Sequence, residues 1–239
     1  MSFWPCSSSS NEGLVSNLRK TSVINSDAVY VAMLKTDRAN YVAQEETPDG
    51  GPIGPLSAYQ DSPHPIGFKQ TISAPHMHAH AMELANATVK DVEHPRILDV
   101  GAGSGYLTAC FGRLVEATGG RVFGLELNSE LVKFARSNIQ KGDGDLLDKG
   151  VVSIHTGNGW DGLPNEAPFN FIHVGAAAGR PPQALMDQLA DGGKLVIPID
   201  QERGGQMLVE ITRHRNSYSQ RQLMGVCYVP LIRGRSTSL

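Results

Sequence analysis

Short apolar runs alternate with amphipathic stretches through the middle of the chain. The runs have the length and composition of buried strands, and the stretches between them carry apolar residues at helical spacing. The expected strands are Arg96–Val100, Val122–Leu127, Val151–His155, Phe169–Val174 and Lys194–Ile199; the expected helices are Tyr106–Ala117, Ser129–Lys141 and Gln183–Leu189. Strands that alternate with helices form parallel βαβ units. The pattern therefore predicts a doubly wound, mostly parallel α/β sheet of the Rossmann-like type.

The flanking segments predict additional elements around this sheet. Between Asn11 and Tyr41, apolar residues at three- and four-residue steps predict two short N-terminal helices. Gly192 and Gly193 predict a turn before the fifth strand. Two strand-like runs near the C-terminal end, joined by a polar linker, predict an antiparallel hairpin at one sheet edge. These runs are Gln206–Thr212 and Gln222–Leu231.

One domain accounts for nearly the whole chain. We assign it to residues 13–232, with a disordered N-terminal tail over 1–12 and a C-terminal tail over 233–239. The Pro/Gly-rich stretch 44–65 breaks both helix and strand, so it predicts a long loop or insertion, either a functional lid or a disordered insert. A helix is expected after it, with Ser73 as the N-cap ahead of Pro75.

Composition limits the class of partner. The 239 residues carry a formal net charge of -3, which gives no bulk attraction to nucleic acid or anionic lipid. Cys6, Cys110 and Cys227 lack metal or redox spacing and are expected to be free thiols. No run approaches the roughly 18 to 20 apolar residues of a membrane helix. We expect a soluble, cytoplasmic monomer that binds neither nucleic acid nor membrane.

A glycine-rich loop follows the first predicted strand. The sequence Gly101-Ala102-Gly103-Ser104-Gly105-Tyr106 stands between that strand and a helix, where glycine lets the backbone approach a ligand. Glu126 ends the next strand, within the roughly 20-residue distance at which a carboxylate accepts both ribose hydroxyls of a nucleotide. Asp99 is a candidate partner for a ligand ammonium, or it fixes the turn.

Three readings of this loop remain open at the level of the residues. Three glycines can make a tight turn without binding anything, with Glu126 a surface acid. A dinucleotide-binding dehydrogenase is a rival, but its G-x-G-x-x-G pattern fails because residue 106 is Tyr. S-adenosylmethionine, which has a ribose and adenine but no phosphate, fits best.

Three further motifs carry a resemblance to a known family. They are TISAPHMHA at Thr71–Ala79, IHVGAAA at Ile172–Ala178 and GVCYVPL at Gly225–Leu231. Together they resemble protein-L-isoaspartate (D-aspartate) O-methyltransferases, and the similarity runs from about Leu14 to Leu231. The resemblance implies a class I methyltransferase fold that binds S-adenosyl-L-methionine and releases S-adenosyl-L-homocysteine.

The implied reaction is methyl transfer to the free α-carboxylate of L-isoaspartyl residues in damaged proteins and peptides, with D-aspartyl residues as a second candidate acceptor. The ester then collapses to a succinimide that can reopen as aspartate. A carboxylate has a reference pKa of about 4 and is ionised at neutral pH, so no general base is required. Catalysis would rest on alignment and on exclusion of water.

The resemblance also assigns site residues. Ser73 matches the family's active-site serine, whose hydroxyl would hold the acceptor carboxylate. The implied cofactor residues are Thr71, Ile72, Ser73, His78, Asp99, Gly101, Ala102, Gly103, Gly105, Glu126, Gly157 and Asn158; the implied substrate residues are Ser73, Val174, Gly175 and Ala176. The family usually has Asp where this chain has Asn158, and an amide accepts from adenine without charge assistance.

Alternative interpretations remain for the site. Ser73 could serve only as the helix cap. His76 and His80 share a helical face with His78 nearby, but a third metal ligand with suitable spacing is not apparent, so we expect no metal. The main non-enzyme alternative is a module that binds isoaspartate or S-adenosylmethionine without turnover.

Overall fold

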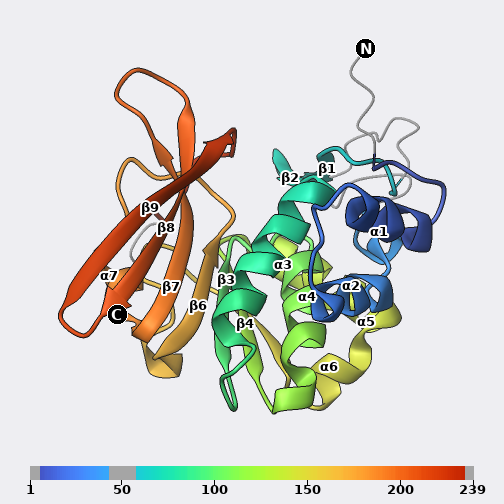
Figure 1. The fold of residues 1–239 in the computed structure, drawn as a ribbon, viewed down its shortest axis with the longest axis horizontal. Helices are drawn as coiled ribbons and strands as arrows, with labels where there is room; N and C mark the ends of the chain where they lie inside the picture. The colour runs from blue at the N-terminus through green and yellow to red at the C-terminus, as the bar shows by residue number, and fades with distance from the viewer. Residues whose placement is uncertain (1–5, 43–57, 235–239) are drawn as a thin grey trace.

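A seven-stranded sheet forms the centre of the molecule (Figure 1). The computed structural model describes residues 6–42 and 58–234. The strand order is β5-β4-β3-β6-β7-β8-β9; the first five are parallel, and β8 and β9 form an antiparallel hairpin at one edge. The bounds are β3 Arg96–Val100, β4 Arg121–Glu126, β5 Val152–Thr156, β6 Phe169–Val174, β7 Leu189–Asp200, β8 Gln206–His214 and β9 Ser217–Val226. This confirms the doubly wound, mostly parallel fold and its C-terminal hairpin.

The sheet buries side chains on both faces, and helices cover the two faces unevenly. Ile97 and Phe171 belong to the apolar cluster under α3, α4 and α5, whereas their strand neighbours Leu98 and Ile172 belong to a second cluster on the opposite face. This second face is covered by α7 and by the loop that carries Trp160. The helix bounds are α3 Pro75–Val89, α4 Tyr106–Val115, α5 Ser129–Gly142, α6 Gly144–Asp148 and α7 Gln183–Asp187, with 3-10 turns Glu116–Thr118 and Pro164–Glu166.

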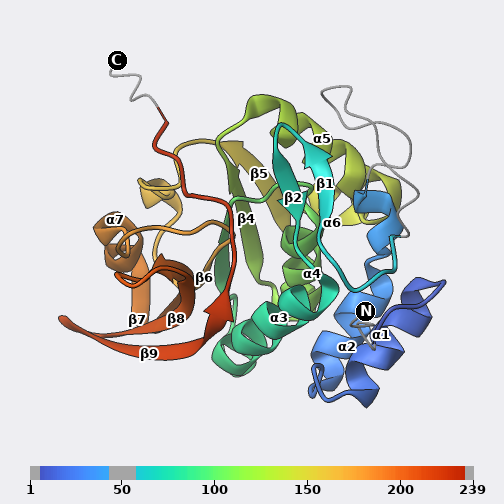
Figure 2. The ribbon, with the colours of Figure 1, turned by 90° about the horizontal axis from the view of Figure 1, so that it is seen from above.

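Two N-terminal helices, α1 (Asn11–Lys20) and α2 (Asp27–Lys35), pack beside α3 and α4, followed by a 3-10 turn at Arg38–Tyr41 (Figure 2). Their presence confirms the helical prediction for this segment. The tail assigned to residues 1–12 differs: α1 begins at Asn11, the Ser10 side chain accepts from the Gly13 N–H, and Cys6 is buried. An N-cap and an apolar contact therefore order residues 6–12, while residues 1–5 lie outside the described part.

A small antiparallel hairpin lies over the carboxyl ends of the sheet strands. Its strands are β1 (His64–Gly67) and β2 (Gln70–Ile72), and the turn residues Phe68 and Lys69 have φ of 51° and 58°. The expected loop over 44–65 is therefore wrong at its end, where β1 begins; residues 43–57 lie outside the described residues. The hairpin was not predicted, because its strands are short and contain Pro65.

Three local predictions are corrected by the structure. The N-cap of α3 is Ala74 and not Ser73, because Pro75 occupies the first turn. Strand β7 begins at Leu189 and runs through Gly192 and Gly193 with a register shift, so these glycines form an irregularity within the strand and not a turn before it. Strand β9 ends at Val226, so the residues that follow leave the sheet.

Cys6, Cys110 and Cys227 are all free, as expected. In the part of the chain that the structure describes, no helix combines the length and the apolar character that a membrane crossing requires.

Candidate functional site

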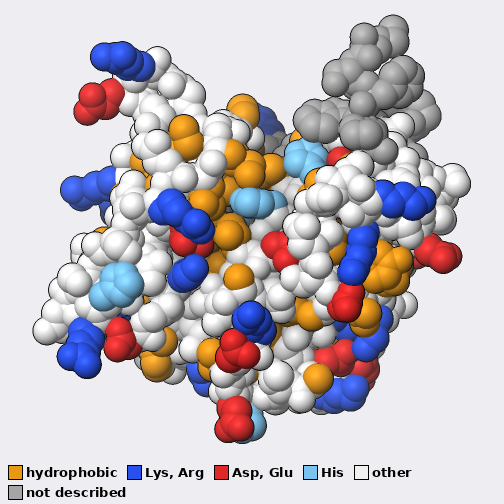
Figure 3. All heavy atoms as spheres, viewed as in Figure 1, with side chains coloured by type: hydrophobic (Ala, Val, Ile, Leu, Met, Phe, Trp, Pro, Cys, Tyr) orange, Lys and Arg blue, Asp and Glu red, His pale blue; other side chains and the backbone are white. Residues whose placement is uncertain are grey.

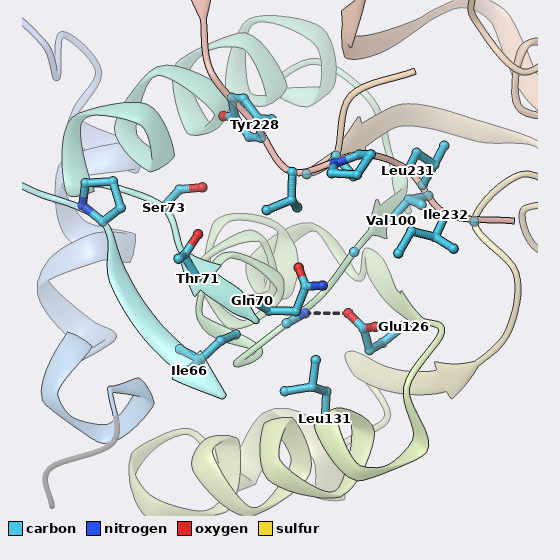
Figure 4. Close-up of a pocket in the computed structure, with 18 of the residues that line it drawn as sticks. Ile66, Gln70, Thr71, Ser73, Val100, Glu126, Leu131, Tyr228, Leu231 and Ile232 are labelled. Atoms are coloured by element: carbon cyan, nitrogen blue, oxygen red, sulfur yellow. Dashed lines mark hydrogen bonds between the residues drawn. The ribbon is translucent and has the colours of Figure 1, made fainter. Parts of the chain in front are cut away.

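A pocket of about 710 Å³ lies where the strand order reverses between β3 and β6. Ligands of open α/β sheets bind at such a switch point, beyond the carboxyl ends of the strands. The pocket wall includes the β1–β2 hairpin, the glycine loop, the end of β4 and the chain after β9 (Figure 4). In the space-filling view, apolar side chains gather in the hollow between the β8–β9 hairpin and the side that carries β1, β2 and α3 (Figure 3).

The glycine loop has the backbone shape that its sequence predicts. Gly101, Gly103 and Gly105 have φ of 80°, 53° and 87°, which side chains rarely tolerate. A Cβ on Gly103 would lie 3.2 Å from Ile66 Cδ1, and one on Gly105 would lie 3.1 Å from the Ala135 Cβ. A side chain at Gly103 would therefore crowd Ile66 in the pocket wall, while Gly105 lets α4 begin close to α5.

Glu126 projects into the same pocket from the end of β4. Its Oε2 accepts from the Gly103 N–H at 3.1 Å, and its Oε1 accepts from the Asn128 N–H at 3.1 Å (Figure 4). The two backbone donors fix the plane of the carboxylate. A carboxylate held in this way still has lone pairs for the hydroxyls of a ligand.

Ser73 lies at another side of the pocket, between β2 and α3. Its carbonyl accepts from Arg38 Nη2 at 2.8 Å. The Arg38 guanidinium is fully buried, and its Nη1 donates to His78 Nδ1 at 3.3 Å. Because Ala74 is the cap of α3, the Ser73 hydroxyl is not used as a helix cap and is available to the pocket.

Burial controls the charges behind Ser73. It holds the pKa of His78 well below its usual value, and the nearby Arg38 cation acts in the same direction. Burial also lowers the pKa of Arg38 to about 10, so the guanidinium stays charged at neutral pH. A neutral His78 can accept the Arg38 bond on Nδ1. This histidine is therefore a positioned acceptor and not a cation.

Asp99 lies beneath the glycine loop, with both oxygens already engaged. Oδ2 accepts from Thr108 Oγ1 at 2.6 Å, and Oδ1 lies 2.8 Å from His173 Nδ1. Among the described residues, Asp99 lines only a smaller pocket of about 40 Å³, together with His78 and Ala102. Its contacts support a role in fixing the turn, the second of the two roles that the sequence left open.

The predicted site residues divide into two groups. Those that line one of these two pockets are Thr71, Ile72, Ser73, His78, Asp99, Gly101, Ala102, Gly103, Glu126, Gly175 and Ala176. Those that line neither are Gly105, Gly157, Asn158 and Val174.

Three residues of the second group have structural contacts that account for their place outside the two pockets. The Val174 side chain is buried in the core, and the Gly157 N–H donates to the Glu126 carbonyl at 2.9 Å. Asn158 Nδ2 donates to Asp161 Oδ2 at 2.9 Å, and Asn158 Oδ1 accepts from the Trp160 N–H at 3.2 Å.

Sequence reasoning missed the wall formed by the chain after β9. This segment is held against the loop after β6, because the Ala177 N–H donates to the Val229 carbonyl at 2.8 Å and the Leu231 N–H donates back to Ala177. Trp160 Nε1 donates to the Leu231 carbonyl at 3.0 Å. Tyr228, Leu231 and Ile232 thereby face the pocket. The GVCYVPL motif marked this segment, but its apolar pattern was assigned to a strand.

Comparison with known proteins places this geometry in a family. A family model for protein-L-isoaspartate(D-aspartate) O-methyltransferase matches residues 9–236. The chain belongs to this family. The isoaspartate O-methyltransferase family match covers the sheet, the hairpin and the pocket segment alike, so it applies to the whole site.

Individual relatives of the isoaspartate O-methyltransferase family extend over nearly the same length. Protein-L-isoaspartate O-methyltransferase of Caenorhabditis elegans is 40% identical over 229 residues, which is 95% of both chains. Protein-L-isoaspartate O-methyltransferase 1 of Arabidopsis thaliana is 41% identical over 231 residues, 96% of this chain and 94% of that one.

A solved structure is similar as well. It is described as a protein-L-isoaspartate O-methyltransferase from Plasmodium falciparum in complex with S-adenosyl-L-homocysteine. It has a TM-score of 0.82 and 34% identity, and the match covers 95% of this chain and 100% of that chain. The resemblance inferred from three short motifs is confirmed.

Proposed function

We propose that this protein transfers the methyl group of S-adenosylmethionine to the α-carboxylate of isoaspartyl residues in proteins and peptides and so begins their repair. The observation that carries the proposal is a single pocket that joins the glycine loop and Glu126 to Ser73. The part formed by the glycine loop and Glu126 suits a nucleoside with an amino-acid end, and the part beside Ser73 suits a small anionic acceptor. The family assignment supports both halves.

The residues present fit the cofactor. Gly101 and Gly103 line the pocket without side chains, and the Glu126 carboxylate is held in the same pocket by two backbone N–H groups. Glu126 would accept from the ribose hydroxyls, and apolar residues such as Leu131 would border the nucleoside. When bound, S-adenosylmethionine supplies an activated methyl group on a positive sulfur.

The acceptor chemistry needs alignment more than activation. One oxygen of the acceptor carboxylate forms the bond to the methyl carbon while the carbon–sulfur bond breaks and its electron pair stays on sulfur. No proton is transferred, so no base is needed. The Ser73 hydroxyl would donate to the carboxylate and hold it in place, and Arg38 would fix the Ser73 backbone from behind. Backbone groups at Gly175 and Ala176 line the same pocket and would border the peptide.

A repair assay tests this function. An isoaspartyl peptide is incubated with the protein, with and without S-adenosylmethionine, and the products are separated by chromatography. We expect the succinimide and then the aspartyl peptide to accumulate only when the cofactor is present. Cofactor binding without conversion would favour the non-enzyme binding module. Stabilisation by NAD, with no effect of S-adenosylmethionine, would favour the dehydrogenase.

We also propose that the protein acts as a monomer in the cytoplasm. Three free cysteines support a reducing compartment, where thiols persist. Sedimentation of the full chain tests the oligomeric state, because a dimer would sediment as a species of twice the mass.

A further inference from the structure

Tyr228 lies on the segment that leaves the sheet after β9 and crosses the pocket (Figure 4). The side chain of Gln206, on β8, holds its backbone at both polar groups. Gln206 Oε1 accepts from the Tyr228 N–H at 2.6 Å, and Gln206 Nε2 donates to the Tyr228 carbonyl at 3.2 Å. The position of the phenol is therefore set by a neighbouring strand and not by a free chain end.

The Tyr228 ring and the Ser73 side chain belong to the same part of the pocket wall. Figure 4 shows both on the side away from Glu126 and Leu131, although they come from segments far apart in the sequence. Burial raises the pKa of Tyr228 to about 12, and an interaction with the Ser73 hydroxyl partly offsets the rise. The phenol thus keeps its proton at neutral pH and is a hydrogen-bond donor there.

We propose that Tyr228 is a second catalytic residue that donates a hydrogen bond to the acceptor carboxylate beside Ser73. The inference rests on the proposed function. A carboxylate held by one hydroxyl can still rotate about that bond, whereas two donors from different segments fix its plane. The lone pair that attacks the methyl carbon then keeps one direction. Because no proton is transferred in the reaction, both hydroxyls act only as donors.

The contrasting interpretation is that the Tyr228 ring is an apolar wall, for which phenylalanine would serve equally well. Tyr228→Phe separates the two, because it removes only the hydroxyl. We expect kcat/KM for an isoaspartyl peptide to fall about 10- to 100-fold, the usual effect of losing a hydrogen bond to a charged group. The Kd of S-adenosyl-L-homocysteine, measured by calorimetry, should stay within about twofold, since the lost group addresses the acceptor.

A matched control uses a tyrosine of the preceding strand, β9. Tyr218 on β9 is exposed, and its hydroxyl lies 3.2 Å from Asp187, outside the pocket. Tyr218→Phe should keep wild-type kinetics. The double variant Ser73→Ala/Tyr228→Phe should lose less than the product of the two single losses, because both hydroxyls would hold one carboxylate.

The outcomes are distinguishable. Wild-type kinetics in Tyr228→Phe would show that the ring is only an apolar wall and would overturn the inference. Loss of cofactor binding in Tyr228→Phe would also overturn it, because the phenol would then have a structural role. Multiplicative losses in the double variant would also contradict a shared carboxylate. If the wild-type protein itself methylates no isoaspartyl peptide, the proposed function fails instead.

Discussion

Replacement of Glu126 by glutamine tests the cofactor half of the pocket. Each carboxylate oxygen of Glu126 accepts one backbone N–H, from Gly103 and from Asn128, at 3.1 Å. A glutamine oxygen can keep one of these bonds, but its amide nitrogen is a donor and would face the other N–H. Glu126→Gln therefore disturbs the loop as well as removing the negative charge that addresses the ligand.

The expected magnitude follows from these contacts. Loss of one backbone hydrogen bond costs about 0.5 to 1.5 kcal/mol of stability, so the protein should remain folded. Hydrogen bonds from ligand hydroxyls to a carboxylate are about twice as strong as those to a neutral amide. We expect cofactor binding to weaken by about 1 to 3 kcal/mol, which is about 5- to 150-fold in Kd.

Calorimetric titration with S-adenosyl-L-homocysteine measures the change directly. Glu130→Gln is the matched control, because Glu130 lies four residues further along at the start of α5, pairs with Lys133 at 2.8 Å and has a side chain that is 53% exposed. This control should bind as the wild type does. Unchanged affinity in folded Glu126→Gln would refute the assignment and leave the carboxylate as a structural support of the loop.

Three further changes probe the rest of the site. Ser73→Ala should lower the rate of methyl transfer strongly while cofactor affinity stays within a few fold. Because Ala74 is the cap of α3, this variant should lose less stability than the roughly 0.5 to 2 kcal/mol of a lost helix cap. Ser73→Thr should restore only part of the rate. Asn158→Asp places a second carboxylate against Asp161 Oδ2, 2.9 Å from the present Asn158 Nδ2, so the melting temperature should fall, and adding Asp161→Asn should restore it. Burial lowers the pKa of His78 in the folded protein below the roughly 6.5 of an unfolded histidine, so the unfolded chain binds more protons than the folded protein below that pH. The free energy of unfolding should therefore fall as the pH is lowered from roughly 6.5. The slope of this fall should be shallower in His78→Gln.

The sheet and the glycine loop could be predicted because their signals are local. Apolar runs of strand length alternate with helical spacing, and Gly101 and Gly103 need φ values of 80° and 53° that only glycine adopts readily. Glu126 follows from the same logic, because the carboxyl ends of neighbouring parallel strands meet at one edge. These positions needed no knowledge of distant contacts.

The remaining parts of the site depend on tertiary contacts that no local pattern contains. The chain after Val226 resembles a continuing strand, but hydrogen bonds to Ala177 and Gln206 draw it across the pocket. The β1–β2 hairpin turns through Phe68 and Lys69 at positive φ, directly after Gly67, and its strands of four and three residues are too short to show an alternating pattern. Ser73 was expected both as a helix cap and, from the resemblance, as the active-site serine; the structure gives the cap to Ala74 and places Ser73 at the pocket.

We expect the pocket to methylate the free α-carboxylate that an isoaspartyl residue has and that an aspartyl residue within a chain lacks. A peptide with one isoaspartyl residue and its aspartyl twin, identical in every other position, are each incubated with the protein and methyl-labelled S-adenosylmethionine, and base-labile methyl ester is counted. We expect labelled ester on the isoaspartyl peptide and only background on its twin. Equal labelling of both peptides, or none on either while the cofactor binds, would contradict it.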